Sequence, residues 1–292
     1  MILIRVDFSS DTGFGHLKRV ESFAKEGIIV CVKCDEKYTK LPVIKIKNEN
    51  EFFELIKKLH PAKVIVDNYN FTYKNEKKFK TLFPNIKLIC FDDTYQKHCC
   101  DEIINVNPAA KREKYPKNIK VTILKKPLVG ENFKTAKKRH FKKNGIFISF
   151  GGTDAKEMSL KVLNILKKHK IKTPIHLYTT GANKNLSKLK RFCFLNRWCR
   201  LHINEDVAAG MAKAEFGIIT PSTVALEAIY INMPFIAVQV AENQKEISKY
   251  LKQKRIKVLS EREIQKIPGF IPGRKKRGFK LEKPSGNQKM DV

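Results

Sequence analysis

The sequence lacks any hydrophobic run that could cross a membrane. No apolar stretch among the 292 residues approaches the roughly 18 residues that a transmembrane helix requires. No charged start is followed by the apolar stretch of a signal peptide either. We therefore expect a cytoplasmic protein with no membrane partner, and the length allows two domains of ordinary size.

Acidic residues are scarce. The chain has 29 Asp and Glu residues against 59 Lys and Arg residues, for a net charge of +30. The basic residues are scattered, and only residues 274–277 form a compact cluster. Aromatic residues are not interleaved with them in a stacking pattern, and no nucleic-acid-binding motif occurs. We therefore expect a lysine-rich solvated surface without a nucleic-acid partner, whose field favours an anionic substrate.

Cysteine is also sparse, with seven residues. An odd number in a large chain fits reduced cytosolic thiols. Cys31 and Cys34 have the spacing of a zinc or redox pair, but Cys99 and Cys100 are adjacent and lack chelating spacing, which His98 does not repair. The sequence therefore predicts no metal site and no cofactor.

What the chain does have is a regular alternation of apolar strands and helices. Such alternation predicts α/β domains with parallel, doubly wound sheets. The pattern restarts after a basic connection, so we expect two Rossmann-like domains facing across a cleft, in a monomeric protein. The predicted divisions are residues 1–125, a connection at 126–144, a second domain at 145–259 and a loosely ordered basic tail at 260–292.

The first strand, residues 2–6, leads into a glycine-containing turn and then a helix. Gly13 and Gly15 allow close approach of a ligand, although a plain tight turn would need the same residues. His16 follows at the predicted start of the helix, where the helix dipole disfavours a protonated ring. A neutral imidazole can accept a proton from water or a hydroxyl group, so His16 is a candidate catalytic base.

Polar side chains follow the next strands of this half. The carboxyl ends of parallel strands meet at one edge of a sheet, where open α/β sheets bind ligands. For Asp92 and Asp93, capping of the next segment is an equal alternative. The residues that we expect at the same edge as His16 are Asp67, Tyr69, Asp92, Asp93, Asn105 and Asn107.

The second half has comparable turns. A strand at residues 146–150 runs into a glycine turn, and a proline and hydroxyl residues open a later helix. Backbone and hydroxyl donors of this kind suit a diphosphate. Glu227, about one turn inside that helix, could accept hydrogen bonds from ribose hydroxyls. The donors are Gly151, Gly152, Thr153, Ser222 and Thr223.

These motifs, in this order, resemble the UDP-sugar hydrolases of pseudaminic acid biosynthesis, the UDP-2,4-diacetamido-2,4,6-trideoxy-β-L-altropyranose hydrolases. These enzymes are related to inverting glycosyltransferases of the two-domain GT-B fold. The resemblance covers about residues 1–258. The matching segments are residues 13–16 with Arg19, 66–69, 91–93, 105–107, 150–154, Ser222-Thr223 with Glu227, and 242–244.

The resemblance implies a metal-independent reaction in which water attacks the anomeric carbon and UDP leaves with inversion, in a pathway linked to flagellin glycosylation. His16 matches the general base, and Glu227 and Asn243 match positions that hold the nucleotide and the sugar. The expected UDP ligands are the five donors above with Glu227. The expected sugar-binding residues are Gly13, Gly15, Arg19, Tyr69, Asp92 and Asn243.

Two other functions remain open from the sequence. A UDP-sugar glycosyltransferase of the same fold would use His16 to activate an acceptor hydroxyl instead of water. A basic nucleic-acid-binding protein would use the glycine turns only as structure. UDP release without an acceptor separates the first from the hydrolase, and UDP affinity separates the second.

Overall fold

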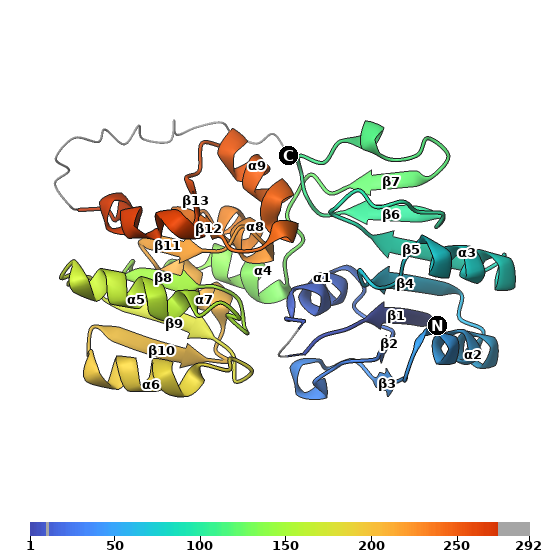
Figure 1. The fold of residues 1–292 in the computed structure, drawn as a ribbon, viewed down its shortest axis with the longest axis horizontal. Coiled ribbons are helices and arrows are strands. Elements are labelled where there is room, and N and C mark those ends of the chain that lie inside the picture. Colours follow the sequence, from blue (N-terminus) through green and yellow to red (C-terminus); the bar gives the residue numbers. More distant parts are fainter. Residues whose placement is uncertain (10–11, 274–292) are drawn as a thin grey trace.

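The computed structural model describes residues 1–9 and 12–273. The chain forms two α/β domains, each built on one sheet whose paired strands are all parallel. Figure 1 shows the domains side by side, with the loops that follow the strands of each domain facing the other domain. The predicted doubly wound, two-domain architecture is confirmed.

The first sheet has seven strands in the order β3-β2-β1-β4-β5-β6-β7. The strand order reverses between β1 and β4, which is where doubly wound sheets bind ligands. The strands are β1 (Ile2–Val6), β2 (Ile28–Cys31), β3 (Val43–Lys45), β4 (Lys63–Asp67), β5 (Lys87–Phe91), β6 (Glu102–Asn105) and β7 (Lys120–Ile123).

The second sheet has six strands in the order β10-β9-β8-β11-β12-β13 and reverses between β8 and β11. Three edge strands were not predicted from the sequence: β7 of the first sheet, and β10 and β13 of the second. The strands are β8 (Ile146–Ser149), β9 (Ile175–Thr179), β10 (Cys199–Ile203), β11 (Phe216–Ile219), β12 (Phe235–Gln239) and β13 (Val258–Ser260).

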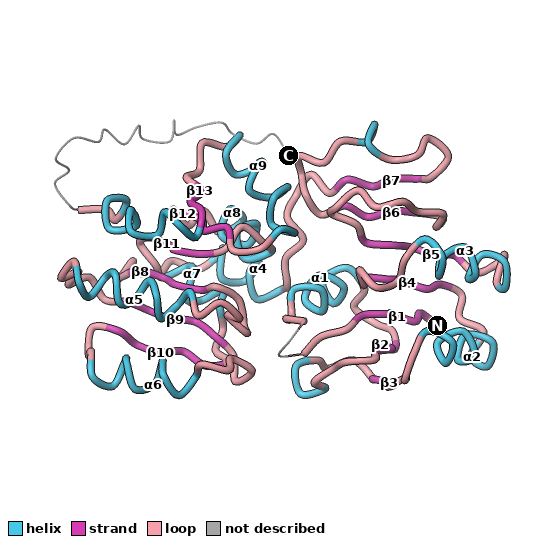
Figure 2. The backbone as a smooth tube through the Cα atoms, viewed as in Figure 1, coloured by secondary structure: helices cyan, strands magenta, loops and turns pink. Residues whose placement is uncertain are grey.

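Helices flank both sheets (Figure 2). The first domain contains α1 (Gly15–Phe23), α2 (Glu49–Leu59) and α3 (Tyr73–Leu82), with short 3₁₀ helices at Glu36–Tyr38 and Arg112–Lys114. The remaining helices are α4 (Glu131–Lys138), α5 (Met158–Lys168), α6 (Leu186–Leu195), α7 (Val207–Lys213), α8 (Thr223–Tyr230) and α9 (Lys245–Gln253), with 3₁₀ helices η3 (Glu242–Gln244) and η4 (Glu261–Phe270).

The strands are apolar throughout because both faces of each sheet are covered. Along β1, Leu3 packs with residues of α2, while Ile4 packs with residues of α1. In β8, Ile148 faces the α5 side and Phe147 faces the α7 and α8 side. A strand buried on both faces cannot alternate polar with apolar residues, so its side chains read as one continuous apolar run.

The predicted connection at residues 126–144 contains a helix. Leu124 and Leu128 pack against the first domain, and Val129 packs against the second, so the chain crosses between these residues. Phe133 and Ala136 of α4 then bury their side chains in the core of the second domain. This segment has few apolar residues because α4 is short and buries only one face, through Phe133 and Ala136.

The prediction of a loose tail from residue 260 is wrong for its first part, because residues Glu261–Phe270 form η4. After β13, Ser260 caps η4 in a reciprocal arrangement with Glu263. Ile264 and Ile267 of η4 then pack into the core of the second domain, and Ile267 is fully buried. Pro268 and Gly269 interrupt the helical spacing of apolar residues in this segment, so the sequence pattern did not predict a helix here. The basic cluster at 274–277 and Phe279 lie outside the described residues.

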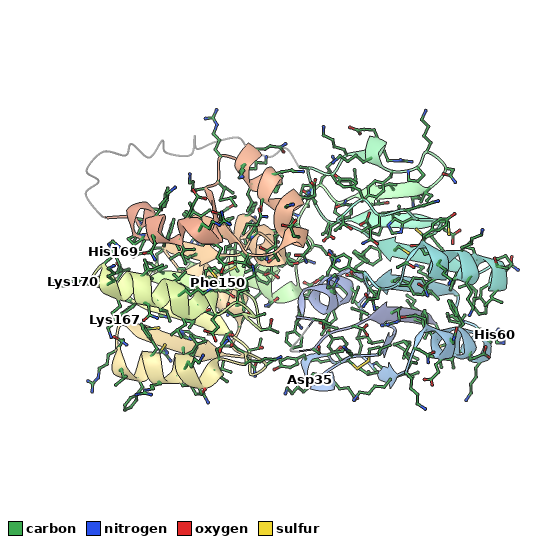
Figure 3. All side chains as sticks on the ribbon, viewed as in Figure 1. Asp35, His60, Phe150, Lys167, His169 and Lys170 are labelled. Carbon is green, nitrogen blue, oxygen red and sulfur yellow. A yellow bond between two sulfur atoms is a disulfide. The ribbon has the colours of Figure 1, made fainter. Side chains whose placement is uncertain are left out.

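The ends of the helices confirm the orientation of the sheets. Figure 3 labels His60 at the end of α2, and His169 and Lys170 at the end of α5, and all three lie far from the junction of the domains. The strands that follow these helices therefore start at the outer ends of the molecule and finish at the junction. Among the described residues, no helix has the length and hydrophobicity to span a membrane.

Candidate active site

His16 lies where the sequence places it, in the first turn of α1 after the glycine turn. Gly13 has φ +82°, a left-handed conformation that favours glycine, and its N–H donates to the carbonyl of Ser9. A side chain at Gly13 or Gly15 would meet nothing within 4 Å, so both glycines border open space. These observations are consistent with room for a ligand beside His16.

The imidazole of His16 is paired with a buried carboxylate. Nδ1 of His16 lies 2.6 Å from Oδ1 of Asp67, the last residue of β4, which is paired with Val6 of β1. The pair therefore sits at the point where the strand order of the first sheet reverses. Nη2 of Arg19 lies 3.0 Å from the same nitrogen. The shorter contact is with a carboxylate, which can only accept a hydrogen bond, so it favours the tautomer with the proton on Nδ1 and the lone pair on Nε2.

Arg19 contacts both oxygens of Asp67, and its Nη2 donates at 2.5 Å to Oδ1, the oxygen that pairs with His16. Its Nε donates to Oδ2 of Asp67 at 2.7 Å, and its Nη1 donates to Oδ2 of Asp93 at 2.8 Å. Burial alone would raise the pKa of Asp67, but the charges and hydrogen bonds of Arg19 and His16 outweigh burial and keep that pKa well below its usual range. Arg19 is 6% exposed and is occupied by these carboxylates, so in this structure it positions Asp67, and its predicted contact with the sugar stays a prediction.

Tyr69 completes this cluster. Its hydroxyl donates to Oδ1 of Asp93 at 2.8 Å, and its ring meets the His16 ring edge-on at 4.8 Å between centroids. Burial and the charge of Asp93 raise the pKa of Tyr69 well above its usual range, so the phenol stays protonated. The structure thus brings together His16, Arg19 and Tyr69 with Asp67 and Asp93, the two acidic residues that were expected at this sheet edge but had no assigned role.

Asp92, predicted from the resemblance to bind the sugar, does not belong to this cluster. Its Oδ1 accepts hydrogen bonds from Thr94, and its Oδ2 accepts one from the backbone N–H of Gln96. The side chain is only 3% exposed. Of the two acidic residues after β5, Asp93 contacts Arg19 and Tyr69, and Asp92 caps the following loop.

In the second domain, the two predicted donor segments are neighbours because β8 and β11 are paired. Gly151 has φ +86° and borders open space. Ser222 starts α8 without a side-chain cap on the helix, so backbone N–H groups of the first turn remain available. The combination suits an anion, since the positive end of a helix dipole lies beside a glycine turn.

Gly152 lies against the first domain. A Cβ atom at this position would meet Phe14 at 3.1 Å and Thr180 at 2.8 Å. A second contact lies nearby, where a Cβ at Gly181 would be 3.5 Å from the hydroxyl of Tyr38. The glycine turn of the second domain therefore packs directly on the turn that precedes His16.

Glu227 projects from α8 one turn beyond Ser222. Its side chain is partly buried and forms no hydrogen bond with another described residue. Burial raises its pKa to about 8, and the charge of Lys18 on α1 opposes this shift. A carboxyl group with a pKa near neutrality is ready to change protonation state when a ligand supplies hydrogen bonds. Lys18 lies two residues after His16 on α1, so the charge of α1 acts on Glu227 of α8 across the junction of the domains.

Asn243 lies in η3, after β12, and is exposed. Its neighbour Gln244 accepts hydrogen bonds from the backbone N–H groups of Val240 and Ala241, which shapes this loop. β12 is paired with β11, so Asn243 lies at the same sheet edge as Ser222.

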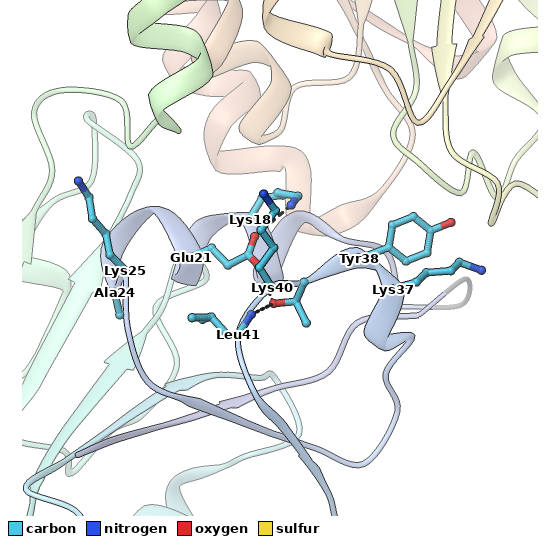
Figure 4. A pocket seen from close by; sticks show the side chains of 9 residues that line it. Lys18, Glu21, Ala24, Lys25, Lys37, Tyr38, Lys40 and Leu41 are labelled. Atoms are coloured by element: carbon cyan, nitrogen blue, oxygen red, sulfur yellow. Dashed lines mark hydrogen bonds and ion pairs between the residues drawn. The ribbon is translucent and has the colours of Figure 1, made fainter.

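A pocket of about 370 Å³ lies on the other side of α1 (Figure 4). Four lysines are among its lining residues, but His16 is not. Glu21 lies in its wall, where it accepts hydrogen bonds from Lys18 at 3.0 Å and from Thr39 at 2.8 Å. The proposed catalytic cluster around His16 is thus separate from this lysine-lined pocket.

The cysteines differ from expectation in two respects. Cys31 and Cys34 form a disulfide, so the expectation of seven reduced thiols is wrong for this pair. Cys90 and Cys100 lie with Glu76 and His98 in a group whose side-chain ligand atoms are all within 4.8 Å of one another. Local spacing did not reveal this group, because its members come from separate segments.

Comparison with known proteins agrees with these observations. No family model matches the chain. Solved structures that resemble it in shape include MurG of Acinetobacter baumannii (TM-score 0.58, 12% identity, 92% of this chain and 89% of that chain). Another is the spinosyn rhamnosyltransferase SpnG complexed with thymidine diphosphate (TM-score 0.59, 10% identity, 89% of this chain and 85% of that chain). At such low identity the likeness shows the fold, which is GT-B.

A curated protein of Campylobacter jejuni subsp. jejuni is more similar in sequence. It is named UDP-2,4-diacetamido-2,4,6-trideoxy-β-L-altropyranose hydrolase and is 34% identical over 274 residues, which cover 88% of this chain and 98% of the relative. The shared length includes both domains and the junction between them. The chain therefore belongs to the family of UDP-2,4-diacetamido-2,4,6-trideoxy-β-L-altropyranose hydrolases.

Proposed function

We propose that the protein hydrolyses UDP-2,4-diacetamido-2,4,6-trideoxy-β-L-altropyranose, releasing UDP and the free sugar with inversion. Membership of the family supports the substrate. The observation that carries the mechanism is the 2.6 Å pair of His16 Nδ1 and Asp67 Oδ1, which leaves the Nε2 lone pair as a proton acceptor. Side chains and backbone groups suited to a diphosphate lie on the facing domain.

In the proposed step, a water molecule forms a bond to the anomeric carbon and gives a proton to Nε2 of His16. The bond between that carbon and the phosphate oxygen breaks, and its electron pair leaves with UDP. Asp67 stabilises the imidazolium as it forms, and Arg19 keeps Asp67 ionised and oriented. One positioned base is enough for this role because UDP is already a good leaving group.

The second domain would hold the nucleotide. Backbone N–H groups of Gly151, Gly152 and Thr153, with Ser222, Thr223 and the start of α8, would meet the charge of the diphosphate. Glu227 would accept hydrogen bonds from the ribose hydroxyls, and Asn243 would contact the substrate from η3. On the first domain, Gly13 and Gly15 leave space for the sugar, and Tyr69 flanks it.

We further propose that the reacting atoms need no metal, and that the enzyme is a cytoplasmic monomer of pseudaminic acid biosynthesis without a nucleic-acid partner. The hydrogen bonds of Asp67 and Asp93 support the first point. Both carboxylates are already shared among Arg19, His16 and Tyr69, so neither is free to ligate a cation.

The test is to incubate the protein with this UDP-sugar alone and to measure free UDP and the anomeric form of the sugar. We expect stoichiometric UDP, with the α anomer as first product, and no release from UDP-N-acetylglucosamine. UDP release that requires an added acceptor would instead identify a glycosyltransferase. Salt-sensitive binding of arbitrary RNA or DNA without UDP affinity would contradict both enzyme functions.

A further inference from the structure

A second constellation of reactive side chains lies inside the first domain. Glu76 comes from α3, Cys90 from β5, and His98 and Cys100 from the segment between β5 and β6. Each offers one ligand atom, and these atoms all lie within 4.8 Å of one another. The four residues are between 1% and 9% exposed.

Contacts within this group hold the ligand atoms close together. Nδ1 of His98 lies 2.6 Å from Oε1 of Glu76, and Sγ of Cys90 lies 3.6 Å from the same oxygen. The other oxygen of Glu76 accepts a hydrogen bond from the backbone N–H of Cys99 at 2.7 Å, which fixes the carboxylate. Sγ of Cys100 belongs to the same group, and its thiol also donates to the carbonyl of Glu102 at 3.4 Å.

The outer nitrogen of His98 is supported as in a metal site. Nε2 lies 3.4 Å from Oδ2 of Asp92, although it makes no hydrogen bond with good geometry among the described residues. Histidine ligands of metals commonly turn their second nitrogen to a carboxylate, which fixes the ring and its tautomer. Asp92 supplies that carboxylate here.

We propose that Glu76, Cys90, His98 and Cys100 bind one structural zinc ion. Two thiolates, one imidazole and one carboxylate form a four-ligand set that suits tetrahedral Zn²⁺. With ordinary bond lengths, such ligands lie about 3.3–3.8 Å apart, so modest movements within the observed group are enough. The hydrogen bond between His98 and Glu76 is exchanged for two bonds to the ion, and the thiol protons and any proton on His98 Nδ1 go to solvent.

The ion would support the active site without touching the substrate. It would tie α3 and β5 to the loop that begins with Asp92 and Asp93. Asp93 in turn contacts Arg19 and Tyr69. No described acidic residue in the catalytic cluster belongs to the zinc group, so the proposal does not depend on the proposed reaction.

Other cysteines provide matched controls. Cys99 lies between two proposed ligands, but its thiol points to the carbonyl of Tyr73 and is not in the group. Cys193 and Cys199 lie 2.8 Å apart between sulfur atoms in the second domain, where the described residues offer no further metal ligands beside them. A response that is specific for the proposed site must therefore spare Cys99 and Cys193.

The experiment uses the full-length reduced protein and the metal ions alone. We expect about one equivalent of zinc in the purified protein, and a tetrahedral cobalt spectrum with thiolate-to-cobalt charge transfer when Co²⁺ replaces it. Cys90→Ser and Cys100→Ser should each weaken this charge-transfer band markedly, because each variant keeps only one thiolate ligand, while Cys99→Ser and Cys193→Ser should leave it unchanged. Asp92→Asn should weaken zinc binding by roughly 10–100-fold.

X-ray absorption at the zinc edge of the unmodified protein supplies a measurement that does not require a variant to fold. Two sulfur and two lighter neighbours are expected. Absence of tight metal binding, a disulfide between Cys90 and Cys100 in place of metal, or an unchanged cobalt spectrum in both serine variants would overturn the site.

Discussion

Nδ1 of His16 and Oδ1 of Asp67 are 2.6 Å apart, although 51 residues separate them in the chain. They meet because β1 and β4 are neighbours in the sheet, so the turn after one strand lies beside the last residue of the other. This relationship determines which nitrogen of His16 is free, and three of the four predictions below depend on the cluster around it.

His16→Asn should leave the fold and UDP affinity intact and lower turnover by roughly 10²–10⁴-fold, the usual contribution of a positioned general base. Steady-state kinetics and UDP calorimetry measure the two effects separately. His140→Asn, at an exposed position, is the matched control. Near-normal kcat with a raised KM would show that His16 only binds the substrate.

Asp67→Asn should lower kcat by about 10²-fold or more, because an amide can stabilise the wrong tautomer of His16. It should also cost roughly 3–5 kcal/mol of unfolding free energy, since Arg19 loses a buried partner. Asp93→Asn is the control, because it disturbs Arg19 but keeps the His16–Asp67 pair. Equal losses of kcat in the two variants, measured with chemical denaturation in parallel, would argue against a specific role of Asp67.

UDP binding should depend on the ionisation of Glu227. If ribose hydroxyls donate to its carboxylate, binding favours the charged form and lowers the raised pKa of about 8. Protons are then released on binding below pH 8, so affinity should rise from pH 7 to 8, by at most about tenfold, and level off above. Calorimetry in buffers of different ionisation enthalpy measures this release. The same pH dependence in Glu227→Gln would place the effect elsewhere.

Added Mg²⁺ or Mn²⁺ should leave kcat unchanged. The carboxylates of Asp67 and Asp93 are engaged by Arg19, His16 and Tyr69, so a cation would have to displace a buried guanidinium. Initial rates of UDP release across a metal titration test this expectation. Saturable activation by either ion would contradict it and would direct attention to the diphosphate contacts. The proposed zinc site is distinct, because its ligands are buried away from His16.

The amino-acid pattern was sufficient for the architecture and for the elements that carry the site. Apolar runs that end in glycine turns predicted both doubly wound sheets, and the positions of His16 and Glu227 on their helices followed from local sequence alone. Short edge strands and η4 were missed, because β10 alternates weakly and Pro268 interrupts the pattern of η4. Patterns of this kind report burial along one segment, so they are most reliable where a strand is covered on both faces.

Contacts between distant segments were decided only by the tertiary structure. Asp92 and Asp93 are equivalent in the sequence, yet successive residues of an extended chain point in opposite directions, and only Asp93 turns toward Arg19. In the same way, Glu76, Cys90 and His98 have no chelating spacing, but the packing of α3 on β5 brings their ligand atoms together. Spacing along the chain determines which face of an element a residue occupies, whereas its partner depends on which elements the sheet makes neighbours.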